Sequence, residues 1–262
     1  MVRHKVIIAF PGPRPESFEA ARMLFCHPGS PHDLEISNSG NSWDNFNTLW
    51  SDALNSAEKD EATHFAMVHA DVEPGEGWLD TSLAELDAKE ADLISCSIRL
   101  KEGTGLLSCG VGNPANRWNP HFRFTVKESL LLPETWNVAD ALNVLGPCGG
   151  AQPDWPLLHN NGCWVADLRR PIFHRTDGAG NLLAWFDFRR RITRKPDGKL
   201  SVFGESEDWF FSRQLNALGA KTFITRKVKT NHKDGSFRFG NWLPVGQEHD
   251  DEARSLWPSE AT

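Results

Sequence analysis

Three short segments carry side chains that can serve one reaction. Asp71 follows an apolar, strand-like run, Glu207 and Asp208 open a segment with helical spacing, and His232 comes late in the chain. A carboxylate held on a turn after a buried strand can ligate a divalent cation, and neutral imidazole is a suitable ligand for manganese. A carboxylate within hydrogen-bonding reach of a hydroxyl can act as a general base. The chain therefore offers one candidate cation ligand at Asp71, another at His232, and a candidate base in the acidic segment that contains Glu207 and Asp208.

Each of these residues also has a structural interpretation. Asp71 can cap the turn before the next helix, and Glu207 and Asp208 can stabilise a helix by facing the positive end of its dipole. A single histidine such as His232 is commonly structural. Ligands of open α/β sheets bind beyond the carboxyl ends of the strands, but position alone favours the structural interpretation of Asp71. The Glu207-Asp208 and His232 segments shift the balance towards function.

The elements that must position these residues alternate along the first hundred positions. Four runs predict strands, at Val6–Phe10, 34–36, 63–68 and 92–98. Three amphipathic stretches predict helices, at 16–25, 43–57 and 79–86. This alternation predicts an α/β fold in which helices cover a mostly parallel sheet.

The second part of the chain is less regular. Residues 101–158 are rich in Gly, Pro and Asn, and we expect loops at 101–120 and 144–160 to form a lid. Ser206 and Gly219 are typical of the start and stop of a helix. Further strands are expected at 163–168, 221–224 and 227–230, and a mobile acidic tail at 249–262.

The charge balance restricts the partners. The chain has 262 residues, with 28 Lys and Arg against 35 Asp and Glu and a net charge of −7. This excess of negative charge argues against a protein that grips nucleic acid mainly through its phosphates. One basic cluster stands out, Arg189–Lys195. It is either a solvated charged loop or a contact for an anionic acceptor, a nucleic acid or a lipid-phosphate surface.

Apolar runs and cysteines indicate a cytoplasmic protein. No run approaches the ~20 apolar residues that span a bilayer, and the apolar stretch near the start is shorter than a signal peptide needs. The five cysteines are scattered, with no Cys-x-x-Cys pair. We therefore expect buried free thiols and no structural zinc site.

Taken in order, these segments resemble the nucleotide-sugar-dependent glycosyltransferases of the GT-A fold, family 2-like. In that family the turn after the central strand usually reads Asp-x-Asp. Here His69 replaces the first Asp and Asp71 stands as the second, with Gly77-Trp78-Leu79 downstream as in the family. The resemblance covers roughly residues 4–235.

The later motifs match as well. The family's Glu-Asp pair corresponds to Glu207-Asp208, followed by Arg213 and Gly219 in the expected pattern. His232 lies where the family often places a late metal-ligating histidine.

The resemblance implies a fold, a reaction and a cofactor. The fold would be a three-layer α/β/α sandwich with a mostly parallel central sheet, forming one domain over 1–248. Its Rossmann-like nucleotide-sugar half would be 1–100 and its acceptor half 101–248. A manganese or magnesium ion held by Asp71 and His232 would bind the donor diphosphate. Asp208, beside Glu207, would be the base of an inverting transfer.

The implied partners are a nucleoside-diphosphate sugar donor and a glycan, a lipid-linked or another hydroxyl acceptor, and a nucleic-acid acceptor stays open. The candidate substrate contacts lie in the first loop, on the sugar side, in the metal turn and on the acceptor side: Pro11, Gly12, Arg14, Asn38, Ser42, Asn47, His69, Asn161, Trp164 and Arg213.

Two alternatives stay open. The first is a sugar-phosphate nucleotidyltransferase, although such enzymes usually carry a Gly-rich, Lys- or Arg-containing signature that residues 11–15 lack. The second is a non-catalytic nucleotide- or sugar-binding domain of the same fold, suggested by His69 in place of the usual Asp.

Overall fold

A seven-stranded sheet forms the centre of the computed structural model, which describes residues 4–11, 32–37, 42–102, 104–234 and 237–242. The strand order is β2-β1-β3-β10-β5-β13-β8. Strand β10 runs antiparallel to β3 and β5, β8 runs antiparallel to β13, and the other neighbours are parallel. The strands are β1 (Val6–Pro11), β2 (His32–Ser37), β3 (His64–Val68), β5 (Leu93–Cys96), β8 (Thr135–Trp136), β10 (Cys163–Asp167) and β13 (Thr222–Thr225).

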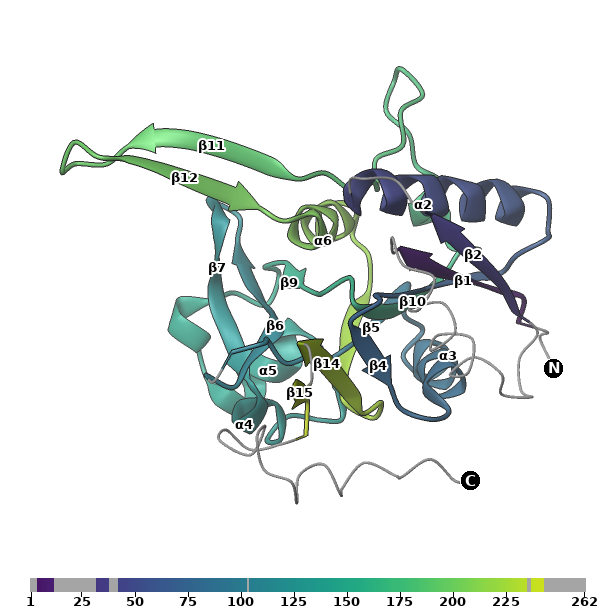
Figure 1. Cartoon of the computed structure of the whole chain (residues 1–262), viewed down its shortest axis with the longest axis horizontal. Helices are drawn as coiled ribbons and strands as arrows, with labels where there is room; N and C mark the ends of the chain where they lie inside the picture. Colours follow the sequence, from purple (N-terminus) through teal and green to yellow (C-terminus); the bar gives the residue numbers. More distant parts are fainter. Residues whose placement is uncertain (1–3, 12–31, 38–41, 103, 235–236, 243–262) are drawn as a thin grey trace.

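Helices cover both faces of this sheet (Figure 1). Helices α2 (Ser42–Glu58) and α6 (Glu207–Leu218) pack on one face, and α3 (Trp78–Ala88) packs on the other. Along β1, Ile7 and Ala9 join the first core while Val6 and Ile8 join the second, because successive strand residues point to opposite faces. The expected α/β fold with three layers and a mostly parallel sheet is confirmed.

Smaller sheets surround this centre. One consists of β4 (Val72–Pro74), β14 (Thr230–Asp234) and β15 (Phe237–Gly240), and another of β6 (Leu106–Asn113), β7 (Asn116–Thr125) and β9 (Leu157–Leu158). Strands β11 (Arg189–Arg194) and β12 (Leu200–Glu205) form a separate hairpin. The described residues also form the helices α4 (Val126–Ser129) and α5 (Val138–Leu145) and two short 3₁₀ turns, Cys148–Gly150 and Pro171–His174.

Three expectations for the second part of the chain are wrong. The loop expected at 101–120 contains β6 and the start of β7. Its glycines have a packing role, because a Cβ on Gly110 would lie 2.4 Å from the Phe122 carbonyl oxygen. The basic cluster forms β11 and not a loop. The strand expected at 227–230 begins only at Thr230, because the Lys227 N–H donates to Thr225 Oγ1 and turns the chain out of the central sheet.

Other expectations lie outside the described residues or concern single features. The helix expected at 16–25 and the acidic tail at 249–262 belong to the undescribed parts. Helix α6 begins after Ser206 and ends at Gly219, as expected, with Gly219 at φ 83°. Among the described residues, no helix is long and apolar enough to cross a bilayer. Cys96, Cys109, Cys148 and Cys163 are buried free thiols.

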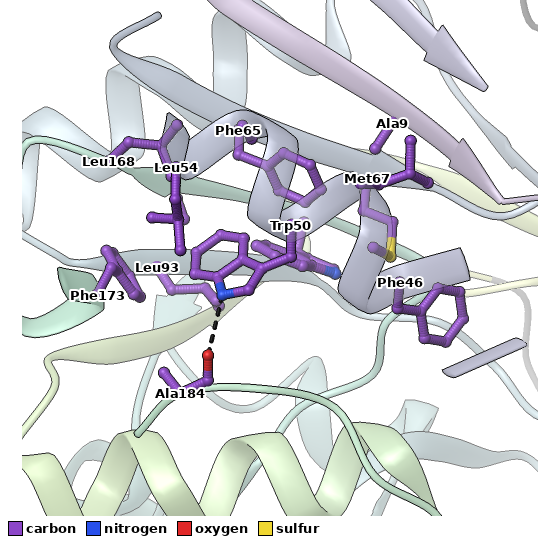
Figure 2. Close-up of a cluster of buried hydrophobic side chains, with 14 of the residues drawn as sticks. Ala9, Phe46, Trp50, Leu54, Phe65, Met67, Leu93, Leu168, Phe173 and Ala184 are labelled. Carbon is purple, nitrogen blue, oxygen red and sulfur yellow. Dashed lines mark hydrogen bonds between the residues drawn. The ribbon is translucent and has the colours of Figure 1, made fainter. Parts of the chain in front are cut away.

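Trp50 is the centre of the core between α2, the sheet and α6 (Figure 2). Its ring contacts Phe65, Phe173 and Phe211 at centroid distances of 5.3, 5.3 and 5.7 Å. Its Nε1–H donates to the Ala184 carbonyl at 3.0 Å. The indole therefore joins the segment around Ala184 to helix α2.

We expect Trp50→Ala to lower the free energy of unfolding by about 3–5 kcal/mol, because it opens a cavity and leaves the Ala184 carbonyl without its donor. Urea denaturation followed by far-ultraviolet circular dichroism measures this change. Leu131→Ala, at a side chain 64% exposed, is the control and should shift stability by less than about 0.5 kcal/mol. Equal effects of the two substitutions would contradict the central role of Trp50.

Candidate active site

Asp71 and His232 meet although they are 161 residues apart in sequence. Asp71 lies on the turn after β3, and β4 follows at once. Strand β14 pairs with β4 so that His232 stands opposite Val72, and the Lys233 N–H donates to the Asp71 carbonyl at 2.7 Å. The His232 Nε2 atom then lies 3.3 Å from Asp71 Oδ2. The register of two short strands thus brings together the two residues that the sequence singles out.

The surroundings of His232 fix its orientation. Its Nδ1 lies 2.8 Å from the Arg99 carbonyl oxygen, so Nδ1 carries a hydrogen and donates it. In the neutral ring, the Nε2 lone pair then faces the Asp71 carboxylate. Two such electron-rich groups repel each other unless a proton or a cation lies with them. A carbonyl that orients an imidazole in this way is common among metal-binding histidines.

Without any bound cation, Lys101 supplies positive charge beside Asp71 and His232. Its Nζ lies 2.6 Å from Asp71 Oδ2, the same oxygen that faces His232. Partial burial raises the pKa of Asp71. Hydrogen bonds donated by His232, with a proton on its Nε2, and by Lys101 outweigh burial and hold the pKa of Asp71 well below its usual range. Asp71 is therefore a carboxylate throughout the neutral range, as a cation ligand must be.

The donor set fits a divalent cation that is shared with a substrate. Asp71 offers a hard oxygen and His232 a borderline nitrogen. Within the described ranges, no group of three or more His, Cys, Asp or Glu side chains is arranged to hold a metal. Two protein ligands would leave the remaining positions to phosphate oxygens and water, which is how Mg²⁺ is commonly bound beside nucleotides.

His69, the residue in place of the family's first Asp, is a neutral imidazole. Its ring stacks on Phe46 of α2, with a centroid distance of 5.1 Å and an interplanar angle of 25°. Burial lowers its pKa to about 4. Its buried Nε2 has no hydrogen-bond partner in the structure. This nitrogen is thus a buried polar atom without a partner, beside α2, and a candidate contact for a ligand.

The segment before β10 adds further unpaired polar atoms. Asn161 is 2% exposed, and both atoms of its side-chain amide lack a partner. Next to it, a Cβ on Gly162 would lie 2.6 Å from the Ile98 side chain and 3.0 Å from Val72, so only glycine fits there. An unpaired buried amide costs about 1–3 kcal/mol. Asn161 is therefore a candidate contact for a bound ligand beside the turn that carries Asp71.

A second feature is the pocket at the start of α6. Asp208 lies in the first turn, where its Oδ1 accepts hydrogen bonds from the Ser206 hydroxyl and, at 2.8 Å, from the Trp209 N–H. The pocket measures about 340 Å³. It is lined by Ser108, Arg123, Phe188, Gly204, Ser206, Asp208 and Trp209.

The pKa of Asp208 lies close to neutral pH. Burial, with a smaller contribution from the neighbouring Glu207, raises the pKa of Asp208 to about 7. The Ser206 hydroxyl and the positive charge of Arg123 act in the opposite direction. Burial also raises the pKa of Glu207. A carboxylate with a pKa near the working pH has the most effective balance for general-base catalysis.

Two connections join the Asp71–His232 pair to the Asp208 pocket. The first runs through Arg99, whose carbonyl accepts a hydrogen bond from His232. The carbonyl of the preceding residue, Ile98, accepts a 2.6 Å hydrogen bond from the N–H of Ser108, which lines the pocket. On the other side, the N–H of His159, two residues before Asn161, donates to Ser212 of α6 at 3.1 Å. Short segments thus connect the two features.

Arg213 of α6 links that helix to β12, β6 and β7. Its Nε lies 2.9 Å from the buried Glu205, and its two terminal nitrogens donate to the carbonyls of Asn113 and Asn116. We expect Arg213→Met to lower the free energy of unfolding by about 3–5 kcal/mol, because Glu205 would be left as an unpaired buried charge. Urea titration at pH 7 measures this. A loss below about 1 kcal/mol would show that this link is dispensable.

The other candidates are distributed as follows. Trp164 is fully buried in the core of α2 and α6, and the Asn47 amide exchanges two 2.8 Å hydrogen bonds with the backbone of Phe186. Pro11 is the last residue of β1. Gly12, Arg14 and Asn38 lie outside the described residues, as does the side chain of Ser42.

Lys101, Ser108 and Arg123 were not candidates in the sequence. They lie between β5 and the end of β7, where the many Gly, Pro and Asn residues obscure the strand pattern. No local pattern in the sequence connects them to Asp71 or Asp208. Only the hairpin pairing of β6 with β7, with its irregular register, would have indicated their positions.

Comparisons with known proteins report no match to a protein-family model or to a curated protein. Among solved structures, the chain is similar to A197 from STIV, with 11% identity, a TM-score of 0.47 and 90% of each chain covered. It is also similar to a mannose-1-phosphate geranyltransferase from Thermus thermophilus, with 13% identity and a TM-score of 0.33, over 63% of this chain and 58% of that one.

A mutant of UDP-glucose pyrophosphorylase from Leishmania major, in complex with UDP-glucose, is similar with 10% identity and a TM-score of 0.32. The match covers 84% of this chain and 51% of the pyrophosphorylase. At these identities and TM-scores, the function must be inferred from the geometry of the site.

Proposed function

We propose that the chain is a glycosyltransferase of the GT-A type, similar to family 2, which transfers a sugar from a nucleoside-diphosphate sugar to an acceptor hydroxyl. The observation that supports this most is the meeting of Asp71 and His232 at the carboxyl end of β3. Ligands of α/β sheets bind at this edge. The pocket of Asp208 supplies the second half of the chemistry.

The donor end has the task of stabilising a diphosphate leaving group. A divalent cation, manganese or magnesium, would neutralise the charge that develops on the diphosphate. Asp71 and His232 would hold it, with His232 kept in place by the Arg99 carbonyl. Lys101 adds a positive charge at the same carboxylate. His69 and Asn161 offer unpaired polar atoms for the donor.

The acceptor end has the task of removing a proton. Asp208 takes the proton of the acceptor hydroxyl as its oxygen attacks the anomeric carbon. The new carbon–oxygen bond forms while the bond to the diphosphate breaks, so the configuration inverts and the proton ends on Asp208. The hydrogen bond from Ser206 orients the carboxylate, and Arg123 favours its ionised form.

A screen of nucleoside-diphosphate sugars tests the proposal. The purified chain is incubated with each donor, with and without Mn²⁺, and release of the nucleoside diphosphate is measured. We expect slow hydrolysis of one donor or a small group of donors, faster with Mn²⁺. Pyrophosphate release from a nucleoside triphosphate and a sugar 1-phosphate would instead identify a nucleotidyltransferase. Metal-independent binding of a nucleotide without turnover would identify a binding domain.

A further inference from the structure

Most residues of the β11–β12 hairpin are exposed or only partly buried. It projects from the body beside α6 and above β7, with its turn far from the central sheet (Figure 1). Its six pairs run in regular register from Arg189 opposite Glu205 to Arg194 opposite Leu200. A two-stranded hairpin on its own is marginally stable in water. The contacts made by its two faces therefore determine its stability and its role.

One face of the hairpin turns towards the protein. Arg189 lies over the Phe210 ring of α6 at 4.1 Å and pairs with Asp187. Arg191, two positions along, lies over Trp118 of β7 at 4.7 Å. Because alternate residues of a strand share a face, these contacts define the inward side. They hold the hairpin at a fixed place beside the Asp208 pocket.

The opposite face consists of aliphatic and basic side chains. Ile192 stands opposite Val202 in the register, and both are 67% exposed, while Leu200 is 63% exposed. Arg190 and Arg194 lie on the same side of β11 as Ile192. Three large aliphatic side chains gathered on one exposed face are more than scattered surface residues. We call this set the outward face.

The charge of the hairpin is opposite to that of the chain. Residues 189–205 contain six Lys or Arg but only two acidic residues, Asp197 and Glu205, whereas the whole chain has a net charge of −7. Glu205 is 1% exposed and already paired with Arg213. The accessible charge of the hairpin is therefore strongly positive, which complements an anionic surface that also accepts aliphatic groups.

We propose that the outward face is a docking site for an anionic lipid bilayer. Ile192, Val202 and Leu200 would enter the boundary between headgroups and acyl chains, and Arg190 and Arg194 would contact lipid phosphates. The aliphatic side chains favour a bilayer over a nucleic acid, since they can neither stack on bases as aromatic rings do nor hydrogen-bond to them.

This docking would orient the Asp208 pocket relative to the bilayer. Phe188, just before β11, and Gly204 of β12 both line that pocket, and a Cβ on Gly204 would lie 3.4 Å from the Phe188 ring. Arg190 of the outward face lies over the Phe188 ring at 4.7 Å, so the outward face adjoins the pocket wall. A bilayer bound to the hairpin would lie beside the place where Asp208 meets its substrate.

Vesicle flotation of the full chain tests the docking directly. The probes are phosphatidylcholine vesicles with and without about 30% phosphatidylglycerol, an anionic lipid. We expect the wild type to float with the anionic vesicles and to remain in solution with the neutral ones. Ile192→Ser/Val202→Ser and, separately, Arg190→Gln/Arg194→Gln should each weaken anionic-vesicle binding about tenfold or more.

Leu131→Ser is the matched control, because Leu131 is exposed to the same degree, 64%, but lies far from the hairpin in sequence. It should float like the wild type. Circular dichroism of every variant checks the fold, which substitutions on an exposed face leave intact. Wild-type protein that does not float, or an Ile192→Ser/Val202→Ser variant that floats equally well, overturns the proposal. Retardation of duplex DNA without vesicle binding overturns it in favour of a nucleic-acid partner.

Discussion

Asp208→Asn is expected to lower kcat by about 100- to 10,000-fold, the usual contribution of a general base. An amide keeps the shape of the side chain and its acceptor for the Ser206 hydroxyl, but it cannot take a proton. The dissociation constant of the nucleoside diphosphate should change by no more than about twofold, since the proposed interaction belongs to the transition state. Steady-state kinetics with the best donor, combined with calorimetric titration of the diphosphate, measures both quantities.

The pH dependence of the wild type gives a second readout of the same prediction. With the pKa of Asp208 near 7, kcat/KM should rise with pH and level off above that value. Ser206→Ala is the matched control, because the Ser206 hydrogen bond lowers the pKa of Asp208. This variant should remain active with its midpoint shifted to higher pH. Near-normal turnover of Asp208→Asn would contradict the assignment of the base.

The stability of the protein should follow the same ionisation. The pKa of Asp208 is raised from 3.8 to about 7 on folding, so the folded state binds a proton more tightly than the unfolded state. Between these two values, the contribution of Asp208 to stability therefore falls as pH rises. Asp208→Asn removes this loss, so its melting temperature should exceed that of the wild type at pH 8 and approach it at pH 4.

Asp71→Asn is expected to remove most turnover and to weaken Mn²⁺-dependent binding of the nucleoside diphosphate by at least about tenfold. The substitution removes the negative charge that attracts a cation and leaves Lys101 and His232 facing a neutral amide. The fold should persist, because the side chain of Asp71 is 44% exposed. Calorimetric titration with Mn²⁺ present or replaced by a chelator measures the effect.

Lys101→Met is the matched control for Asp71. It removes the ammonium group that lies 2.6 Å from Asp71 Oδ2 and leaves both proposed ligands in place. Mn²⁺-dependent binding should be retained or strengthened, since no fixed positive charge then competes for the carboxylate. Metal-dependent binding that survives in Asp71→Asn but disappears in Lys101→Met would reverse the proposed roles of the two residues.

The local part of the fold could be predicted from the sequence. The spacing of Phe46, Leu49 and Trp50 is visible within one helix, and the apolar run 64–68 is visible within one strand. Both signals depend only on neighbours in sequence. The position of the turn that carries Asp71 could be predicted in the same way, because the chain must turn where the strand ends.

The pairing of strands that are far apart in the chain could not be predicted from the sequence. The residues of β10 alternate in the same way whether the strand runs parallel or antiparallel, so its insertion between β3 and β5 has no local signature. The same holds for Lys101, whose contact with Asp71 depends on where β6 and β7 pack. The near-neutral pKa of Asp208 arises from burial by several elements, and no motif encodes burial.

The most direct measurement is a crystal structure of the chain with Mn²⁺ and the nucleoside diphosphate that the donor screen identifies. It should show the cation bound by Asp71 and His232, the Lys101 ammonium displaced from Asp71 Oδ2, and the diphosphate directed towards the Asp208 pocket. A nucleotide bound elsewhere, with the contact between Lys101 and Asp71 intact, would contradict the claim that these residues form one donor site.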